Sequence, residues 1–195
     1  MLFRSQGRRF SNEMGGYSEQ AVKVLAQPGG IAWNIYDAER HAFALAGFPD
    51  YRDAVEAGAI RSGNTVAELA SATGLPEYAL GKTIDDVQAL ARDNGTDTFG
   101  RNFSDVSPLA APFHTVRVTG ALFHTQGGLS IGSDARVLRK DGTAFPNLYA
   151  SGGAACGVSG PGVEGYLSGN GLLTAIAFGF LAGRNAALVA TRGAA

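Results

Sequence analysis

The sequence holds little cysteine, little excess charge and no recognisable targeting signal. Its 195 residues include one cysteine, Cys156, which excludes an internal disulfide and a metal site built from several cysteines. We expect this side chain to be a small filler in a loop of glycine and alanine. The formal net charge is −1 and no basic run occurs, which argues against a nucleic-acid partner. The first ten residues lack the apolar segment of a signal peptide, so we expect a cytoplasmic protein.

Two longer patterns are also missing. The apolar run at residues 171–183 is shorter than the ~20 residues that cross a bilayer. It contains Thr174 and is followed by Arg184, so a buried core helix is expected and no membrane span. No G-x-G-x-x-G occurs near the start of the chain, where a dinucleotide-binding fold places its phosphate loop.

What is present indicates a globular protein of one or two domains. Apolar residues make up 45% of the sequence, which is enough for a core. Up to about residue 112 the pattern predicts a mixture of short helices and strands. Helices are expected at residues 18–25, 65–73, 75–81 and 83–91, and a strand at residues 29–36.

The last third of the sequence predicts hairpins followed by a strand, a loop and a helix. Turn residues at 132–134 and at 141–142 indicate the hairpins. A buried strand is expected at 148–151, and a long apolar helix opens near 168–171. Glycine lets the backbone approach a flat or phosphorylated group, and a helix N-terminus offers N–H donors to it. We therefore expect this part to form one side of a cofactor pocket, because the loop is rich in glycine, at positions 152, 153, 157, 160, 162, 165, 169 and 171.

Five segments carry a family resemblance. They are GRRFSNE at 7–13, NTVAELASATGLPEYAL at 64–80, TQGGL at 125–129, LYASG at 148–152 and the GNGL helix that starts at 169. In this order and spacing the chain resembles the C-terminal half of the fumarate reductase/succinate dehydrogenase flavoprotein superfamily, which includes the 3-ketosteroid Δ1-dehydrogenases. The resemblance implies FAD, a capping domain over the flavin, and hydride transfer at a C–C bond beside a carbonyl or carboxylate.

The resemblance also implies the fold and the cofactor contacts. The chain is expected to be α/β, with an α+β capping domain at residues 1–112 and the C-terminal part of a Rossmann-like FAD-binding domain at 113–195. The N-terminal G-x-G-x-x-G unit would be a missing partner segment. Gly153 stands where many relatives carry a glutamate that contacts the cofactor hydroxyls. The implied cofactor-binding residues are Gly127, Gly128, Ser151, Gly152, Gly153, Gly169, Asn170, Gly171 and Leu172.

Three departures from the fumarate reductases bear on the substrate. Those enzymes carry a histidine at the position of Phe123, a substrate-clamping arginine at that of Tyr166, and a proton-shuttling arginine at that of Tyr17. Fixed cations bind a dicarboxylate, whereas phenols can donate to a ketone oxygen or accept a proton. The two tyrosine positions resemble those of the ketosteroid dehydrogenases. Tyr17 and Tyr166 are therefore the expected catalytic residues, and an enone or ketosteroid-type ketone is the expected substrate.

The remaining candidates concern the substrate pocket and the capping turn. Phe123, His124 and His114 are expected to line the pocket. His124 has no carboxylate or cysteine neighbour at metal-ligand spacing, and no metal site is expected. Glu13 is expected to be a structural acceptor that orders the turn, and His41 is expected at the surface.

Two alternatives stay open at this point. One is a fumarate/succinate-type oxidoreductase, in which Arg8, Arg9, Arg101 or Arg117 would replace the missing cations. The other is an inactive truncated chain that serves as a partner-binding module.

Overall fold

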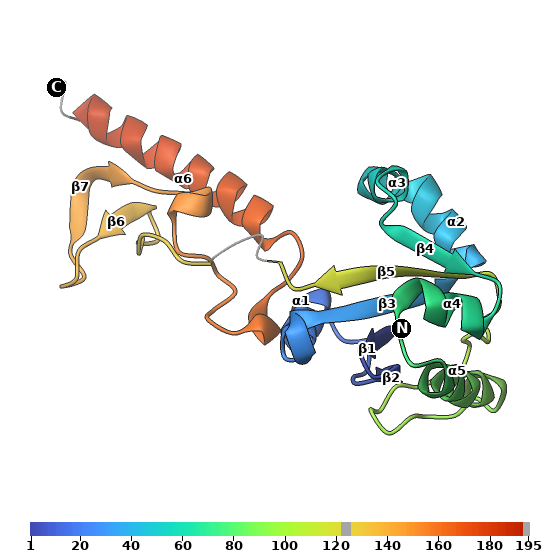
Figure 1. The fold of residues 1–195 in the computed structure, drawn as a ribbon. Helices are drawn as coiled ribbons and strands as arrows, with labels where there is room; N and C mark the ends of the chain where they lie inside the picture. Colours follow the sequence, from blue (N-terminus) through green and yellow to red (C-terminus); the bar gives the residue numbers. More distant parts are fainter. Residues whose placement is uncertain (122–125, 193–195) are drawn as a thin grey trace. The chain divides into compact units, whose positions relative to one another are not determined.

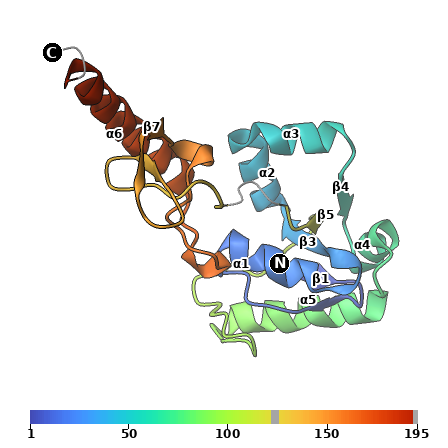
Figure 2. The same cartoon turned by 90° about the vertical axis from the view of Figure 1, so that its left-hand side faces the viewer.

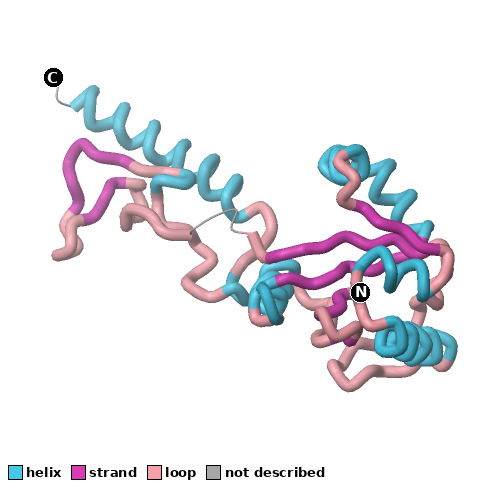
Figure 3. The backbone as a smooth tube through the Cα atoms, in the orientation of Figure 1, coloured by secondary structure: helices cyan, strands magenta, loops and turns pink. Residues whose placement is uncertain are grey.

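The chain forms two compact units. The computed structural model describes residues 1–121 and 126–192, and divides the chain into Met1–Ala121 and Leu122–Ala195 (Figures 1 and 3). The sequence-based boundary at 112/113 precedes the strand β5 (Phe113–Thr119), whereas the structure divides the chain after it. The reason is hydrogen bonding, because β5 pairs along its length with two other strands of the first unit.

A five-stranded antiparallel sheet forms the centre of the first unit. Its strand order is β2-β1-β3-β5-β4, and every pairing is antiparallel. The expected strand at 29–36 is confirmed as the central β3, whose register sets Tyr36 opposite His114 and Ile35 opposite Thr115. The other strands are β1 (Leu2–Arg4), β2 (Arg8–Arg9) and β4 (Ile60–Gly63), and β3 spans Ile31–Asp37.

Helices cover both faces of this sheet (Figure 2). The main core lies on one face, where Trp33 and Ile35 of β3 and Phe3 of β1 meet buried side chains of α4 and α5. On the other face, α2 and α3 carry His41 and Tyr51 against the ends of β3 and β5. The helices are α1 (Tyr17–Leu25), α2 (Ala38–Gly47), α3 (Pro49–Glu56), α4 (Val66–Thr73) and α5 (Glu77–Arg92).

The expected helices at 18–25 and 65–73 are confirmed as α1 and α4. Helix α4 begins at a Thr65 N-cap, whose side chain accepts a hydrogen bond from the Glu68 amide, and it ends at Gly74 with a φ of +75°. The prediction of two helices at 75–81 and 83–91 is wrong, since α5 runs through both. A single interior glycine, Gly81, costs only about 1 kcal/mol, and the buried face of α5 outweighs it.

A buried ion network fixes the turn after β2. Arg9 donates to Glu13 at 2.5 Å and to Asp97 at 2.6 Å, and Arg101 donates to Glu13 at 2.8 Å. The side chains of Arg9, Asp97 and Glu13 are 4%, 6% and 11% exposed. Burial alone would raise the pKa of Glu13, but its hydrogen bonds and ion pairs, chiefly with Arg9, outweigh burial and lower the pKa to about 2. The expected role of Glu13 as a structural acceptor agrees with this arrangement.

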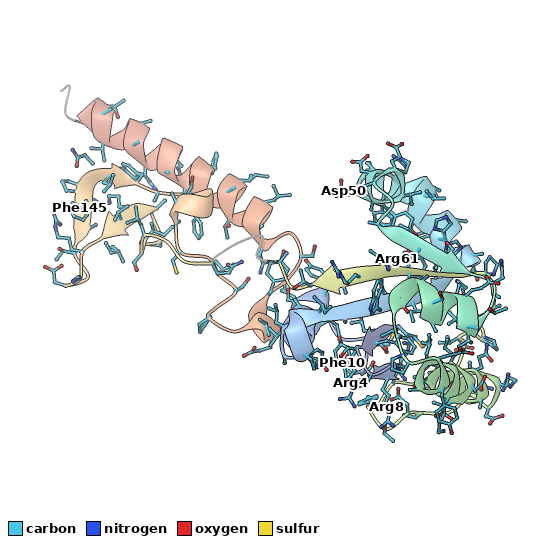
Figure 4. All side chains as sticks on the ribbon, viewed as in Figure 1. Arg4, Arg8, Phe10, Asp50, Arg61 and Phe145 are labelled. Atoms are coloured by element: carbon cyan, nitrogen blue, oxygen red, sulfur yellow. The ribbon has the colours of Figure 1, made fainter. Side chains whose placement is uncertain are left out.

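The second unit is a hairpin packed on a long helix. Strand β6 (Arg136–Leu138) pairs with β7 (Ala144–Tyr149) across the expected turn at Asp141. Two short 3-10 helices, η2 (Gly152–Ala154) and η3 (Val163–Gly165), precede α6 (Asn170–Arg192). Val137, Ala150 and Ala155 form the small core, with Phe145 of β7 (Figure 4) partly buried against it. The Asn185 side chain donates to the Asp134 carbonyl at 3.0 Å and ties α6 to the hairpin.

Two expectations about this unit are wrong. Strand β7 is not a buried strand, because Leu148 is 44% exposed. Helix α6 is not the expected buried core helix within this chain, because most side chains along Asn170–Arg192 are exposed. Its length and hydropathy match those of a membrane-spanning helix, a criterion that core helices of soluble proteins also meet.

We expect Glu13→Gln to destabilise the first unit by ~3 kcal/mol at neutral pH, because removing one partner leaves buried guanidinium charge uncompensated. Chemical denaturation followed by Trp33 fluorescence measures this, since Trp33 is the single tryptophan and lies in the core of that unit. Because the pKa of Glu13 is lower in the folded chain, its stabilisation is present above pH 4.5 and is lost as the pH falls toward about 2.

The Glu13→Gln variant should lack this loss of stability at low pH. Asp86→Asn is the matched control, because it breaks an ion pair with Lys82 in which both side chains are 61% exposed. Equal destabilisation by the two variants would contradict the importance of the buried network.

Candidate cofactor site

Three segments of the second unit meet around the glycine-rich loop. Residues 126–129 run beside residues 154–157, with hydrogen bonds from the Leu129 amide to the Ala154 carbonyl at 2.9 Å and from the Cys156 amide to the Leu129 carbonyl at 2.9 Å. The loop in turn packs on α6 through η2, where Gly152 lies against Ala175. The expected cofactor-binding residues, separated by up to 45 positions in sequence, thus gather in one unit.

Glycine is required where the first two segments touch. A Cβ built on Gly128 would overlap the backbone of Ala155 and Cys156. A Cβ on Gly157 would likewise overlap the Gln126 side chain. Residues 126–128 can therefore lie close to the loop only because Gly128 carries no side chain.

Other glycines of the same loop face open space, and these fit a cofactor. A Cβ on Gly153, Gly160 or Gly169 would meet nothing within 4 Å, so ligand atoms can approach the backbone there. Helix α6 begins at Asn170, and its first turn holds no acidic side chain that would compete for its N–H groups. A helix start of this kind favours an anionic or electron-rich group. The N–H groups at the start of α6 are therefore suited to the flavin end of FAD.

The sequence does spell G-x-G-x-x-G once, at residues 160–165. The structure places it in a loop that contains η3 and is not flanked by a strand and a helix. A phosphate loop needs that strand–turn–helix setting, so this match is no dinucleotide fingerprint. Sequence reasoning missed Ser159 just before it, a buried serine whose hydroxyl accepts a hydrogen bond from the Asn170 side chain at 2.6 Å.

The two candidate catalytic tyrosines lie in different units. Tyr166 follows η3 in the second unit and is half-buried. Tyr17 is the first residue of α1 in the first unit and is 62% exposed. Phe123 and His124, the expected substrate-pocket residues, lie outside the described residues.

His114 belongs to a ring cluster on the sheet of the first unit. Its ring stacks on His41 of α2, with centroids 3.9 Å apart and planes 2° from parallel, and its Nδ1 lies 2.9 Å from the Ser62 hydroxyl. The Nδ1 of His41 bonds the Tyr51 hydroxyl at 2.7 Å, which bonds that of Tyr36 at 2.5 Å. Burial first, and then the neighbouring His41, lower the pKa of His114. His41 was expected at the surface, but it is half-buried because this stacking holds α2 on the sheet.

The sequence profile of the FAD binding domain family matches residues 1–172. The chain belongs to this family. The match confirms the expected flavoprotein resemblance and its cofactor, FAD. The described residues hold no group of three or more histidine, cysteine, aspartate or glutamate side chains suited to a metal ion.

Known proteins of the family resemble the chain over almost its full length. A probable fumarate reductase of Shewanella frigidimarina is 31% identical, over 96% of this chain and 31% of its own. A 4-oxocyclohex-2-ene-1-carboxylate 5-dehydrogenase of Sinomonas cyclohexanicum is 28% identical, over 95% of this chain and 35% of its own. The chain spans about a third of the length of these relatives.

Solved structures agree with this placement. An open flavocytochrome c3 fumarate reductase superposes with a TM-score of 0.72 at 30% identity, over 97% of this chain and 32% of that one. A 3-ketosteroid-Δ4-(5α)-dehydrogenase of Rhodococcus jostii RHA1 superposes with a TM-score of 0.64 at 25% identity, over 96% and 38%. The α/β fold expected from the resemblance is thereby confirmed.

We expect Gly128→Ala to separate the two docked segments, because its new Cβ overlaps the Ala155 backbone. Hydrogen exchange of the chain should then speed up about tenfold or more at the Leu129 and Cys156 amides, whose hydrogen bonds cross this contact. Gly183→Ala is the control, since that glycine lies within α6 and a Cβ there meets nothing. Unchanged exchange at Leu129 in Gly128→Ala would contradict the close approach.

We expect His114 to titrate below pH 6.5 in an NMR titration, since burial and His41 both disfavour its charged form. Its stabilising contribution is therefore present above pH 6.5 and is lost as the pH falls through the lowered pKa. Asp37 opposes the shift, while Arg40, Tyr36 and Tyr51 are the other ionisable groups of this region.

His41→Phe should move the midpoint upward but not fully to 6.5, because burial is the larger cause. Glu39→Gln, an exposed change at the start of α2, should leave it unchanged. A His114 midpoint that does not respond to His41→Phe would contradict electrostatic coupling across the stack.

Proposed function

We propose that the chain is part of an FAD-dependent oxidoreductase that transfers hydride at a C–C bond next to a ketone carbonyl. We choose a ketone over a dicarboxylate because two arginines that could bind a dicarboxylate are already in ion pairs. Arg9 and Arg101 of the first unit are already paired with carboxylates, and tyrosines occupy two of the positions at which fumarate reductases carry cations.

A dicarboxylate needs two or more fixed cations in a dry site, because unpaired buried charge is costly. Arg9 is held by Glu13 and Asp97, and Arg101 by Glu13. Arg8 and Arg117, the other candidates, are exposed on their strands. Arg9 and Arg101 thus serve the turn after β2 and are not spare cations.

Glu13 is also unsuited to supply a proton near neutral pH, since its pKa is lowered to about 2. This leaves the proton chemistry to other groups. We assign it to Tyr17 and Tyr166, one phenol donating to the ketone oxygen and the other exchanging the proton on the carbon beside the carbonyl. Both assignments rest on the positions that these tyrosines occupy in the family pattern.

The second unit supplies the flavin side of the site. FAD, when bound, exchanges hydride with the carbon of the substrate C–C bond. Residues 126–128 and the loop at 151–153 would lie along the ring system, and the first turn of α6 would direct its N–H groups at the end where negative charge develops. We place Gly127, Gly128, Ser151, Gly152, Gly153, Gly169, Asn170, Gly171 and Leu172 in this role.

The names of the relatives support a shared chemistry. Fumarate, the cyclohexene carboxylate and the ketosteroid named for these proteins each have a C–C bond beside a carbonyl or carboxylate carbon. Two of the three substrates carry a ring ketone, as the tyrosine pair requires. The dicarboxylate remains a second candidate, favoured by the 31% identity to the probable fumarate reductase.

The exposed side of α6 indicates what the FAD site still lacks. Large apolar side chains lie bare along it, which is costly for a surface in water. We propose that a nucleotide-binding segment of the kind found in FAD proteins covers this side and supplies the diphosphate and adenosine contacts. The chain in isolation should accordingly hold FAD weakly. The apolar residues concerned are Leu173, Ile176 and Phe180.

We expect Tyr166→Phe to reduce turnover of a cyclic enone or 3-ketosteroid by ~10²–10³, as for the loss of one donor to a developing oxyanion. The measurement is steady-state kinetics on the flavin-loaded protein that contains this chain. Tyr17→Phe should cause a loss of similar kind, with a changed pH profile. Tyr78→Phe is the matched control, because Tyr78 is 84% exposed and should have no effect.

Fumarate and succinate are the comparison substrates in the same assay. Fumarate reduction faster than enone turnover would contradict the ketone assignment and support the dicarboxylate alternative. A Tyr166→Phe enzyme as fast as the parent protein on ketones would contradict the role of the phenol.

A further inference from the structure

Ser159 is a buried residue in a segment that is otherwise open to solvent. Its exposure is 8%, whereas no other residue from Cys156 to Asn170 is buried. A serine is an unusual residue to anchor a loop by burial, because its hydroxyl must find a partner there. The partner is Asn170, whose side-chain amide donates to the Ser159 hydroxyl at 2.6 Å.

The backbone of Ser159 makes a second contact within the same loop. A Cβ built on Gly165 would overlap the Ser159 carbonyl oxygen, so the chain returns at residue 165 to touch residue 159. Ser159 therefore meets the loop at two points: its carbonyl lies close to Gly165, and its hydroxyl accepts a hydrogen bond from Asn170.

Tyr166 lies directly after the first of these points and four residues before the second. The Tyr166 amide also donates to the Val163 carbonyl at 3.2 Å, which closes η3 on the N-terminal side of the tyrosine. Asn170 is the first residue of α6, and the Thr174 hydroxyl donates to its carbonyl at 2.9 Å. The loop that carries the tyrosine is thus fastened to the start of the long helix through Ser159.

We infer that Ser159 is a positioning residue, which sets Tyr166 relative to the start of α6 by packing against Gly165 and accepting a hydrogen bond from Asn170. The inference rests on the proposed function for its catalytic consequence, but its structural part can be tested without turnover. Accurate placement matters because a displacement of about 1 Å can cost as much as ~10²-fold in rate.

The first test reports on Tyr166 without catalysis. The chain is labelled with 3-fluorotyrosine, and the ¹⁹F resonance of Tyr166 is assigned by its absence in Tyr166→Phe. Ser159→Ala removes the hydroxyl acceptor and should shift or broaden this resonance, while Ser159→Thr keeps the hydroxyl and should restore it. Ser133→Ala is the matched control, because Ser133 is an exposed serine in the hairpin turn of the same unit.

Gly165→Ala tests the second contact by a different route. Its methyl group would push on the Ser159 carbonyl and should move the same resonance, even though the serine is intact. This variant keeps the inference testable if Ser159→Ala fails to fold. An unchanged Tyr166 resonance in both Ser159→Ala and Gly165→Ala, or no restoration by Ser159→Thr, would overturn the inference.

The second test measures the catalytic consequence in the flavin-loaded protein. Ser159→Ala should lower kcat for a cyclic enone by about 10- to 100-fold with KM changed less than threefold, and Ser159→Thr should recover most of the rate. If Tyr166→Phe has no effect on turnover, the proposed function fails, while the resonance measurement still decides the role of Ser159. A normal kcat in Ser159→Ala, together with a strong effect of Tyr166→Phe, would overturn the positioning role alone.

Discussion

The arrangement of the second unit depends on a close backbone approach. Gly128 lies so near Ala155 and Cys156 that a single methyl group would separate the two segments. The two hydrogen bonds that Leu129 makes across this contact fix the loop that leads to α6. Because glycine has no side chain, the approach leaves both segments with exposed backbone, which can in turn lie against a flat ring system. The same absence of side chains that permits the packing therefore leaves the open backbone against which we place the flavin.

The elements with strong local signals could be predicted from the sequence. Thr65 and Gly74 bracket α4, and the glycines before β3 together with Asp37 at its end identify a strand. Helices α2 and α3 were missed, although Asp37 accepts a hydrogen bond from the Arg40 amide at the start of α2 and Pro49 begins α3. Neither helix has a fully buried residue, so the apolar periodicity that reveals a helix is weak in both. What fixes them is the ring cluster that joins α2 and α3 to the sheet, a tertiary contact that no local pattern shows.

Some parts of the candidate site could be predicted from local motifs, whereas others become visible only from tertiary packing. The glycines and the helix start could be found because their spacing is local, and they do gather in one unit. The buried ion network could not be predicted from the sequence, since Asp97 and Arg101 are far in sequence from Arg9 and Glu13. This network changes the interpretation of the arginines, which look available in the sequence but are held in ion pairs in the structure. The role of Ser159 could not be predicted either. A serine before Gly-Pro-Gly is typical of an exposed turn, and only the structure shows that it is buried.

The apolar side of α6 and its open N-terminal end are connected. A helix of 23 residues with bare leucine, isoleucine and phenylalanine on its side must be covered by protein or by another apolar phase. Its first turn, by contrast, has no acidic side chain and is preceded by glycines that leave space around it. Once its sides are covered, the N-terminal end is the part of the helix that remains able to meet a polar ligand. A covered apolar side would thus leave the glycine-lined N-terminus of α6, where we place the flavin, as the end whose N–H groups meet a ligand.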